Sequence, residues 1–288
     1  MIRLASLLLA AAVPVAASAQ SGPTTTAAVQ RDHVSIRDEG GTGPVVILIP
    51  GLSSPRAVWD GVVPALKAKH RVLTVQVNGF AGDAPRGNLT PGILAGIVAD
   101  LDAHIVANRL GAPAVVGHSM GGLVGMMLAK AHPDHVGRLM IVDSLPYIGE
   151  LFLPGVTVAQ VEPRAKAMRD QVVATWGRPA DAATAEATAN SLAATPDARA
   201  KVKAWFVATD PRVTAQALYE DMTTDLRPDV AGFALPITLV YPAPGDALYH
   251  RAYGAAPKVT YVPVADAAHF VMLDQPAAFA TALDDFLK

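Results

Sequence analysis

The sequence predicts an α/β protein with a mostly parallel sheet, covered by helices on both faces and interrupted once by a helical insertion. Apolar runs of strand length alternate with helical patterns, which implies right-handed crossovers between parallel strands. Between Leu145 and about Leu235 the strand-like runs vanish, and prolines punctuate helical segments. The strand pattern then resumes at Pro236 and continues almost to the C-terminus.

The N-terminus has the pattern of a secretory signal peptide. Arg3 is followed by an apolar stretch, residues 4–16, that is too short to span a bilayer, and Ala17-Ser18-Ala19 forms an Ala-x-Ala cleavage site. We therefore expect residues 1–19 to be removed and residues 20–32 to form a flexible leader, with order beginning near His33. The mature protein is expected to be periplasmic or secreted, without a membrane anchor after signal removal.

Composition and charge narrow the range of partners. The chain has 288 residues, no cysteine and a formal net charge of −2 at pH 7, so neither a disulfide nor a lipid-modified cysteine can form. No run of Lys or Arg supplies a phosphate-binding stripe, which disfavours nucleic acid and anionic membrane surfaces. A neutral small molecule fits better, and the sequence gives no indication of the oligomeric state.

The core elements follow from turns and apolar periodicity. Residues 33–37 alternate and lead into a Gly-rich turn, which indicates an edge strand, and the apolar run 44–50 indicates a buried strand. Further strands are predicted at residues 71–77, 114–116, 138–142, 236–241 and 258–264, and helices at residues 91–110, 123–131 and 276–287. The core thus comprises residues 33–144 and 236–288, and residues 145–235 form a helical cap.

The most informative motif is Gly117-His118-Ser119-Met120-Gly121, between a strand pattern and a helix pattern. A Ser at a sharp strand-to-helix turn has a strained backbone, and the turn leaves no room for side chains two positions before and after it. The helix that starts there points free N–H groups at the place where an oxyanion would form. The motif therefore predicts that Ser119 is a nucleophile; the alternative is an ordinary glycine turn.

Together with three other features in the same order, this motif resembles the α/β-hydrolase fold family from His33 to the C-terminus. The other features are the turn Pro50-Gly51-Leu52, an Asp after the strand that follows the insertion, and the segment Ala268-His269-Phe270-Val271-Met272. The resemblance implies an α/β-hydrolase fold with a helical cap, and the order nucleophile, acid, histidine along the chain.

His269 is the candidate base, because its loop between the last strand and the terminal helix can reach Ser119 across the carboxyl ends of the strands. Asp246 is the predicted acid, since the family usually places the acid after this strand. Asp143, which ends the preceding strand, is the alternative acid. Asp266 is expected to shape the His269 loop by bonds from its side chain to the backbone.

The backbone amides of Leu52 and Met120 are the predicted oxyanion hole. No metal or cofactor is implied: His132 and His135 flank a proline at a helix end, with no further ligand near them in the sequence. Several apolar cap residues are expected to wall a pocket above the nucleophile. They are Leu151, Phe152, Leu153, Trp176, Trp205 and Phe206.

These residues imply a serine hydrolase of small hydrophobic carboxylic esters. In the implied mechanism His269 deprotonates Ser119, and Asp246 orients the imidazole. The same groups would also serve hydrolysis of amide, lactone or C–C bonds, or haloperoxidase-like perhydrolysis. A non-catalytic ligand-binding protein with this fold is the remaining alternative, and the complete triad argues against it.

Overall fold

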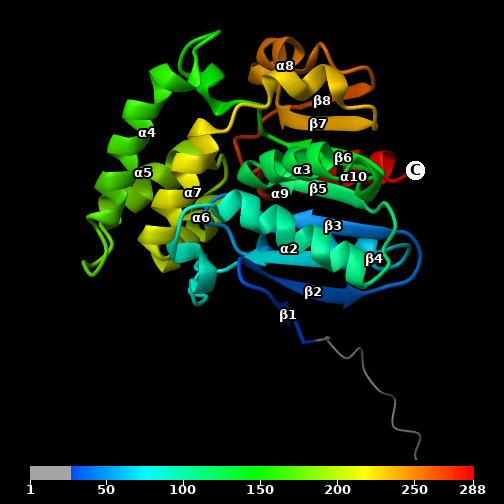
Figure 1. The fold of residues 1–288 in the computed structure, drawn as a ribbon, viewed down its shortest axis with the longest axis horizontal. Helices are drawn as coiled ribbons and strands as arrows, with labels where there is room; N and C mark the ends of the chain where they lie inside the picture. The colour runs from blue at the N-terminus through cyan, green and yellow to red at the C-terminus, as the bar shows by residue number, and fades with distance from the viewer. Residues whose placement is uncertain (1–26) are drawn as a thin grey trace, which may run out of the picture.

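The computed structural model describes residues 27–288, and the predicted signal peptide lies outside them. An eight-stranded sheet forms its centre, in the order β1-β2-β4-β3-β5-β6-β7-β8. β2 is antiparallel to both of its neighbours, and all other neighbouring pairs are parallel. Helices cover both faces, with α2, α3 and α8 in front of the sheet and α10 behind it in Figure 1. The predicted α/β class with a mostly parallel sheet is confirmed.

Most strands occupy the apolar runs that predict them. Their bounds are β1 Val29–Gln30, β2 Val34–Gly40, β3 Val45–Ile49, β4 Arg71–Val77, β5 Ala114–His118, β6 Arg138–Val142, β7 Ile237–Pro242 and β8 Val259–Val264. β3 is apolar throughout because both of its faces are covered: Ile47 and Ile49 pack on the side of α2 and α3, whereas Val46 and Leu48 pack on the side of α10.

The N-terminal edge of the sheet differs from the prediction. Val29 and Gln30, expected in the flexible leader, form β1 and pair antiparallel with β2. β2 is therefore an inner strand. A strand of two residues is too short to give a periodic signal, and a side-chain contact holds it: Gln30 Nε2 donates to Asn78 Oδ1 at 2.9 Å.

The helices of the core lie between successive strands or, for the last two, after β8. They are α1 Val63–Leu66, α2 Ile93–Ala107, α3 Met120–Ala131, α8 Asp246–Tyr253, α9 Val271–Asp274 and α10 Pro276–Phe286, with 3-10 turns η1 Arg56–Trp59, η2 Arg86–Leu89, η3 Pro133–His135 and η6 Ala243–Gly245. Over residues 27–288, no helix combines the length and the apolar character needed to cross a bilayer.

Between β6 and β7 the chain leaves the sheet and forms the cap at one end of the molecule (Figure 1). Its elements are η4 Ile148–Leu151, α4 Val158–Val173, α5 Ala182–Leu192, α6 Pro196–Ala208, α7 Pro211–Thr223 and η5 Arg227–Gly232. α4 packs on α7, and α5 packs on α6. The cap is thus built from two helix pairs.

Two carboxylates fasten the cap to the core. Glu220 of α7 accepts hydrogen bonds from three amides at the start of α2, residues 92–94, at 2.6–3.1 Å. Asp274, at the end of α9, accepts from the amides of Ala194 and Thr195 before α6 and from that of Ala268, at 2.9–3.0 Å. Because a helix start leaves its N–H groups without intrahelical partners, each carboxylate joins cap and core where the backbone needs an acceptor.

We expect Asp274→Ala to lower the free energy of unfolding by about 2–4 kcal/mol, because it leaves partly buried amides without acceptors. Urea unfolding followed by circular dichroism measures the change. Asp285→Ala is the control: its side chain is largely exposed beside Lys288, so the effect should stay below about 0.5 kcal/mol. Equal effects of the two substitutions would contradict the anchoring role.

Candidate active site

The turn at Ser119 has the geometry of a nucleophile elbow. Ser119 follows β5 directly, with φ 53° and ψ −124°, and α3 begins at the next residue. A Cβ on Gly117 would lie 2.1 Å from the carbonyl oxygen of Gly121, and a Cβ on Gly121 would lie 2.4 Å from that of Ile49. Both positions therefore require glycine, and the tight crossing holds Ser119 at the carboxyl end of the sheet in a strained conformation.

Ser119 and His269 line one cavity of about 100 Å³, at the carboxyl ends of β5 and β6. His269 comes from the loop between β8 and α9, and its side chain is 24% exposed. The structure therefore brings the predicted nucleophile and base to the same cavity. The other lining residues are Asp143, Ser144, Leu145, Ile148, Leu151, Asp221 and Tyr249.

Asp143 is the carboxylate that holds His269. Its Oδ2 lies 2.5 Å from His269 Nδ1, and its Oδ1 accepts a hydrogen bond from the Tyr249 hydroxyl at 2.6 Å. Since a carboxylate accepts, Nδ1 carries the proton, and in the neutral ring the lone pair lies on Nε2. Burial and the Asp143 charge raise the pKa of Tyr249 well above its ordinary value, so its hydroxyl stays a donor.

This geometry corrects the prediction that Asp246 orients His269. Asp246 is the first residue of α8; its Oδ1 accepts from the Tyr241 hydroxyl at 2.6 Å, and its side chain is half exposed. The loop after β7 closes into η6 and passes at once into α8, which turns this carboxylate back onto β7. The alternative acid, Asp143, follows β6 directly with φ 46° and occupies the position beside the base.

The two predicted oxyanion-hole amides are free to donate. Within residues 27–288, neither the Leu52 amide nor the Met120 amide donates to a carbonyl or side chain. Met120 is the first residue of α3, where a helix leaves its N–H groups unpaired. Leu52 follows Gly51, which lies so near the elbow that a Cβ there would be 3.0 Å from Ser119 Cβ. Both amides can therefore stabilise a negative oxygen formed beside Ser119.

His118 supports the loop that carries His269. It is 1% exposed, and its Nε2 donates to the carbonyl oxygen of His269 at 3.0 Å. Burial lowers the pKa of His118 well below its ordinary value, and the nearby charge of His269 acts in the same direction. The ring is therefore a neutral positioning group that does not face the cavity.

Asp274, and not Asp266, makes the side-chain bond expected in this loop. Asp266 has φ 55°, and its carbonyl oxygen accepts from Gln275 Nε2 at 2.9 Å. The carboxylate bonded to the amide just before His269 is that of Asp274. The Asp274 carboxylate also accepts hydrogen bonds from the cap. These bonds join segments that are far apart in the sequence, so no local sequence pattern indicates them.

Asp221 of α7 is a site residue that the sequence analysis missed. It is 7% exposed and lines the cavity, and within the described chain no donor lies at hydrogen-bond distance from its carboxyl. Burial raises its pKa to about 7, while the charge of His269 acts in the opposite direction. Val213 and Ala217 pack in the core at four-residue spacing before it. The sequence signal that could have identified Asp221 is a carboxyl at the end of this apolar stripe.

A second, larger groove of about 490 Å³ lies beside Leu52 under the cap. Val172, Phe206 and Leu218 line it together with several threonines. Of the six apolar residues expected to wall a pocket, two do so: Leu151 lines the small cavity and Phe206 the groove.

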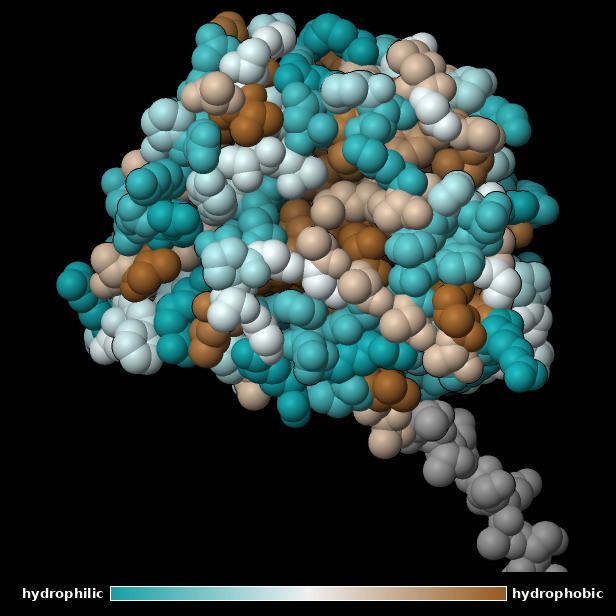
Figure 2. Space-filling view, viewed as in Figure 1, coloured by the Kyte–Doolittle hydropathy of each residue, from teal (hydrophilic) through white to brown (hydrophobic). Residues whose placement is uncertain are grey.

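The other four apolar cap residues do not line these two spaces. Trp205 packs on Phe270, with ring centroids 6.2 Å apart. Phe152, Leu153 and Trp176 are 45–59% exposed. In Figure 2 hydrophilic side chains cover most of the visible face, and hydrophobic ones gather near its middle. The cap therefore uses only part of its apolar surface to enclose the site.

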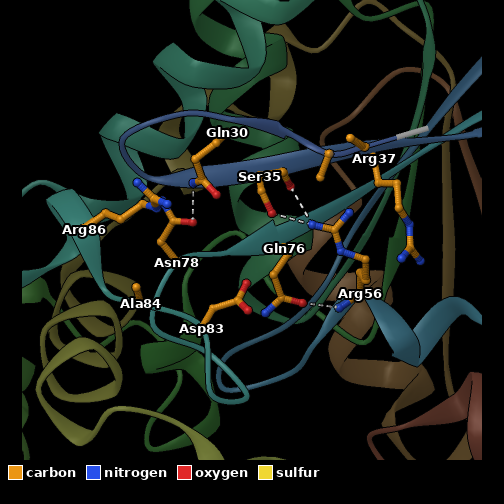
Figure 3. A pocket seen from close by; sticks show the side chains of 11 residues that line it. Gln30, Ser35, Arg37, Arg56, Gln76, Asn78, Asp83, Ala84 and Arg86 are labelled. Atoms are coloured by element: carbon orange, nitrogen blue, oxygen red, sulfur yellow. Dashed lines mark hydrogen bonds between the residues drawn. The ribbon is translucent and has the colours of Figure 1, made fainter. Parts of the chain in front are cut away.

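A polar cavity of about 530 Å³ lies near the N-terminal edge of the sheet and contains none of the candidate catalytic residues. Arg56 is already bonded here: its guanidinium donates to the Ser35 hydroxyl, and its backbone amide donates to Gln76 Oε1 (Figure 3). Burial lowers the pKa of Arg56, and the charge of Arg37 adds to this. These contacts account for the polar side chains as supports of the sheet edge.

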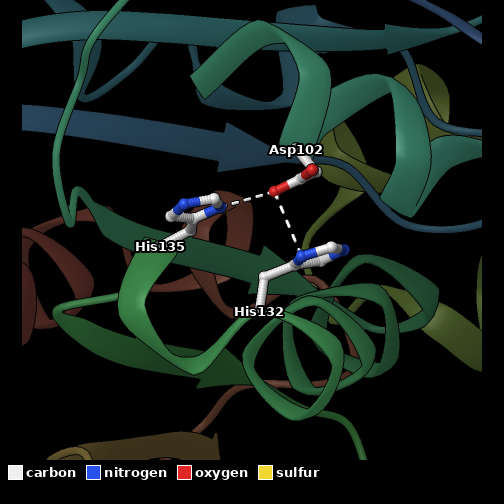
Figure 4. Close-up of side chains that lie close together, drawn as sticks. All are labelled: Asp102, His132 and His135. Atoms are coloured by element: carbon white, nitrogen blue, oxygen red, sulfur yellow. Dashed lines mark hydrogen bonds and ion pairs between the residues drawn. The ribbon is translucent and has the colours of Figure 1, made fainter. Parts of the chain in front are cut away.

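Asp102, His132 and His135 form a cluster with donor atoms within 4.8 Å of one another. Asp102 Oδ1 lies 2.5 Å from His135 Nδ1 and 3.3 Å from His132 Nδ1 (Figure 4). The third ligand missing near these histidines in the sequence thus comes from α2, and the three groups could hold a divalent cation. His132 and His135 follow α3 whereas Ser119 precedes it, about 18 Å away along the helix, so the cluster takes no part at Ser119.

The sheet order, the strained serine between β5 and α3 and the loop histidine after β8 together define the α/β-hydrolase class. The model of the alpha/beta hydrolase family matches residues 46–282, and the chain belongs to this family. The resemblance found in the sequence is thereby confirmed.

Relatives and solved structures agree with this assignment. The chain is 27% identical over 256 residues to a pimeloyl-[acyl-carrier protein] methyl ester esterase of Edwardsiella ictaluri, covering 84% of this chain and 92% of that protein. A protein of the same description from Aeromonas hydrophila is 35% identical over 106 residues, which is 40% of its length. The enol-lactonase of Burkholderia xenovorans LB400 has a TM-score of 0.72 at 24% identity, covering 88% of this chain and 96% of that one. An esterase of Thermogutta terrifontis has a TM-score of 0.74 at 20% identity, covering 91% and 98%.

We expect Asp221→Asn to stabilise the protein more at about pH 8 than at about pH 5. Because burial raises the pKa of Asp221 to about 7, the folded chain keeps a proton that the unfolded chain releases near pH 4, so wild-type stability falls as pH rises from 4 to 7. The asparagine variant lacks this loss, and its advantage should grow by up to about 3 kcal/mol between these pH values. Urea unfolding of both proteins at each pH measures it, and a pH-independent difference would contradict the assignment.

Proposed function

We propose that this protein is a serine hydrolase that cleaves carboxylic esters with a small alcohol part, using Ser119, His269 and Asp143. The observation that carries the proposal is the 2.5 Å contact between Asp143 and His269 Nδ1, at a cavity that Ser119 also lines. This contact leaves the Nε2 lone pair free to accept the serine proton. Esterase-named relatives support the same class of reaction.

The chemistry follows from the positions of these groups. His269 Nε2 takes the proton of Ser119 as its hydroxyl oxygen attacks the ester carbonyl, and the amides of Leu52 and Met120 stabilise the oxyanion. Asp143 stabilises the imidazolium cation, which then gives its proton to the departing alkoxide oxygen. Water, deprotonated by the same histidine, releases the acid and restores the serine.

The two spaces around the elbow suggest where each part of the ester binds. The small cavity includes His269, which protonates the leaving alcohol, and its volume of about 100 Å³ is that of about three water molecules. The larger groove includes Leu52 of the oxyanion hole and suits an apolar acyl group. The relatives described as methyl ester esterases fit a small alcohol part. With the signal-peptide pattern, we place this activity in the periplasm or outside the cell.

Ser119→Ala should abolish ester hydrolysis and labelling by a fluorophosphonate, because it removes the nucleophile. Turnover of a panel of butanoate esters, with mass spectrometry of the labelled protein, measures both effects. The variant should retain the wild-type circular dichroism spectrum, since the substitution deletes little packing. Labelling of another serine, or hydrolysis of lactones or amides without ester hydrolysis, would contradict the proposal.

Asp143→Asn should lower kcat by about 10³–10⁴-fold, because it removes the stabilisation of the imidazolium and favours the wrong tautomer. Asp246→Asn is the matched control, since Asp246 bonds to Tyr241 instead, and its effect should stay below about tenfold. Steady-state kinetics of both variants on one ester show which substitution lowers kcat more. A larger loss of kcat in Asp246→Asn would indicate that Asp246, after β7, is the acid.

A further inference from the structure

One ionisable group in the catalytic cavity has no role in the mechanism above. Asp221 is 7% exposed, and no donor in the described part of the chain bonds to its carboxyl. Burying a polar group without a partner destabilises a protein by about 1–3 kcal/mol. A buried carboxyl that has no protein partner and lines a cavity beside a nucleophile is a candidate for binding a ligand.

Two of the other polar side chains that line this cavity, Tyr249 and His269, already donate to a neighbour. The Tyr249 hydroxyl and His269 Nδ1 both donate to Asp143, so neither proton is free for a bound molecule. Among residues 27–288, no Lys or Arg lines the cavity. Besides the hydroxyls of Ser119 and Ser144, which belong to the core, the Asp221 carboxyl of the cap is therefore the lining group that remains to bond to a substrate.

The surroundings favour the protonated form of this carboxyl. Leu145, Ile148 and Leu151 line the same cavity, so apolar side chains surround this carboxyl. Burial raises the pKa of Asp221, and a bound substrate excludes further water. A protonated carboxyl is a hydrogen-bond donor.

Two carboxylates on elements near α7, those of Glu150 and Glu162, have other partners. His269 is the group whose charge acts on Asp221. Glu150 of η4 accepts from Arg227, and Glu162 of α4 accepts from the Tyr219 hydroxyl. Neither carboxylate lines the cavity.

We propose that Asp221 is a specificity-determining residue that donates a hydrogen bond from its protonated carboxyl to an oxygen in the alcohol part of the ester. This inference rests on the proposed ester hydrolysis and narrows its substrates to esters of small alcohols that carry an ether, hydroxyl or carbonyl oxygen. An alcohol without such an oxygen leaves the buried donor without an acceptor, which lowers its kcat/KM.

The test compares butyl butanoate with 2-methoxyethyl butanoate, in which one methylene of the alcohol part is replaced by an ether oxygen. The ratio of their kcat/KM values at about pH 6 is measured for wild type, Asp221→Leu and Asp221→Asn. Comparing one ratio across enzymes removes the intrinsic difference in reactivity. We expect the preference for the ether to be about five- to tenfold greater in wild type than in Asp221→Leu, and largely retained in Asp221→Asn, whose amide still donates. Asp221→Ala replaces the leucine variant if that protein does not fold.

Each other outcome overturns the inference. Equal ratios in wild type and Asp221→Leu would show that this carboxyl does not contact the alcohol. A preference for 2-(dimethylamino)ethyl butanoate that depends on Asp221 would show that it binds as a carboxylate. An effect found only between ethyl pentanoate and ethyl 3-methoxypropanoate would place the acyl part in the cavity. If a fluorophosphonate labels Ser119 but the ester ratios are equal in wild type and Asp221→Leu, only the inference about Asp221 is wrong. If none of these esters is hydrolysed and Ser119 is not labelled, the proposed function is wrong as well.

Discussion

The close crossing of β5, α3 and the turn after β3 is the constraint on which the site depends. No Cβ fits at Gly117 or Gly121, so the strand and helix meet at backbone contact distance and the intervening Ser119 adopts a positive φ. The same contact places the free amide of Met120 next to the serine and the amide of Leu52 across from it. The proposed nucleophile and the proposed oxyanion donors therefore come from one steric requirement.

Packing of three tyrosines from β7 and α8 decides which carboxylate lies beside His269. Tyr241, Tyr249 and Tyr253 stack in succession, with ring centroids 4.1 Å and 6.3 Å apart. Their hydroxyls donate to Asp246, to Asp143 and to the carbonyl oxygen after it, respectively. The stacked tyrosines thus bond to Asp246, which follows β7, and hold Asp143, which follows β6, beside His269.

Local patterns predicted the parts of the structure that depend on local physics. Apolar runs gave β3, β4 and β6 nearly to the residue, and the glycine spacing gave the elbow. The choice between Asp143 and Asp246 depends on which strand end faces His269, and that is decided by tertiary packing of α8. Asp221 was missed because the cap offers a helical pattern but no indication of which helix meets the nucleophile.

The two carboxylate anchors hold α6 and α7 to the core directly, whereas α4 and α5 are held by packing on those two helices. Glu220 and Asp274 bind α7 and α6 to the core, and α5 packs on α6. α4 packs on α7 through a small apolar cluster that includes Val161, Ala165 and Met222. Both α4 and α5 contribute residues to the groove, so a movement that opens it while both anchors stay bonded displaces one of these two helices. An acyl group of the proposed ester would then enter beneath α4 or α5, while the anchored helix α7 keeps Asp221 in place beside Ser119.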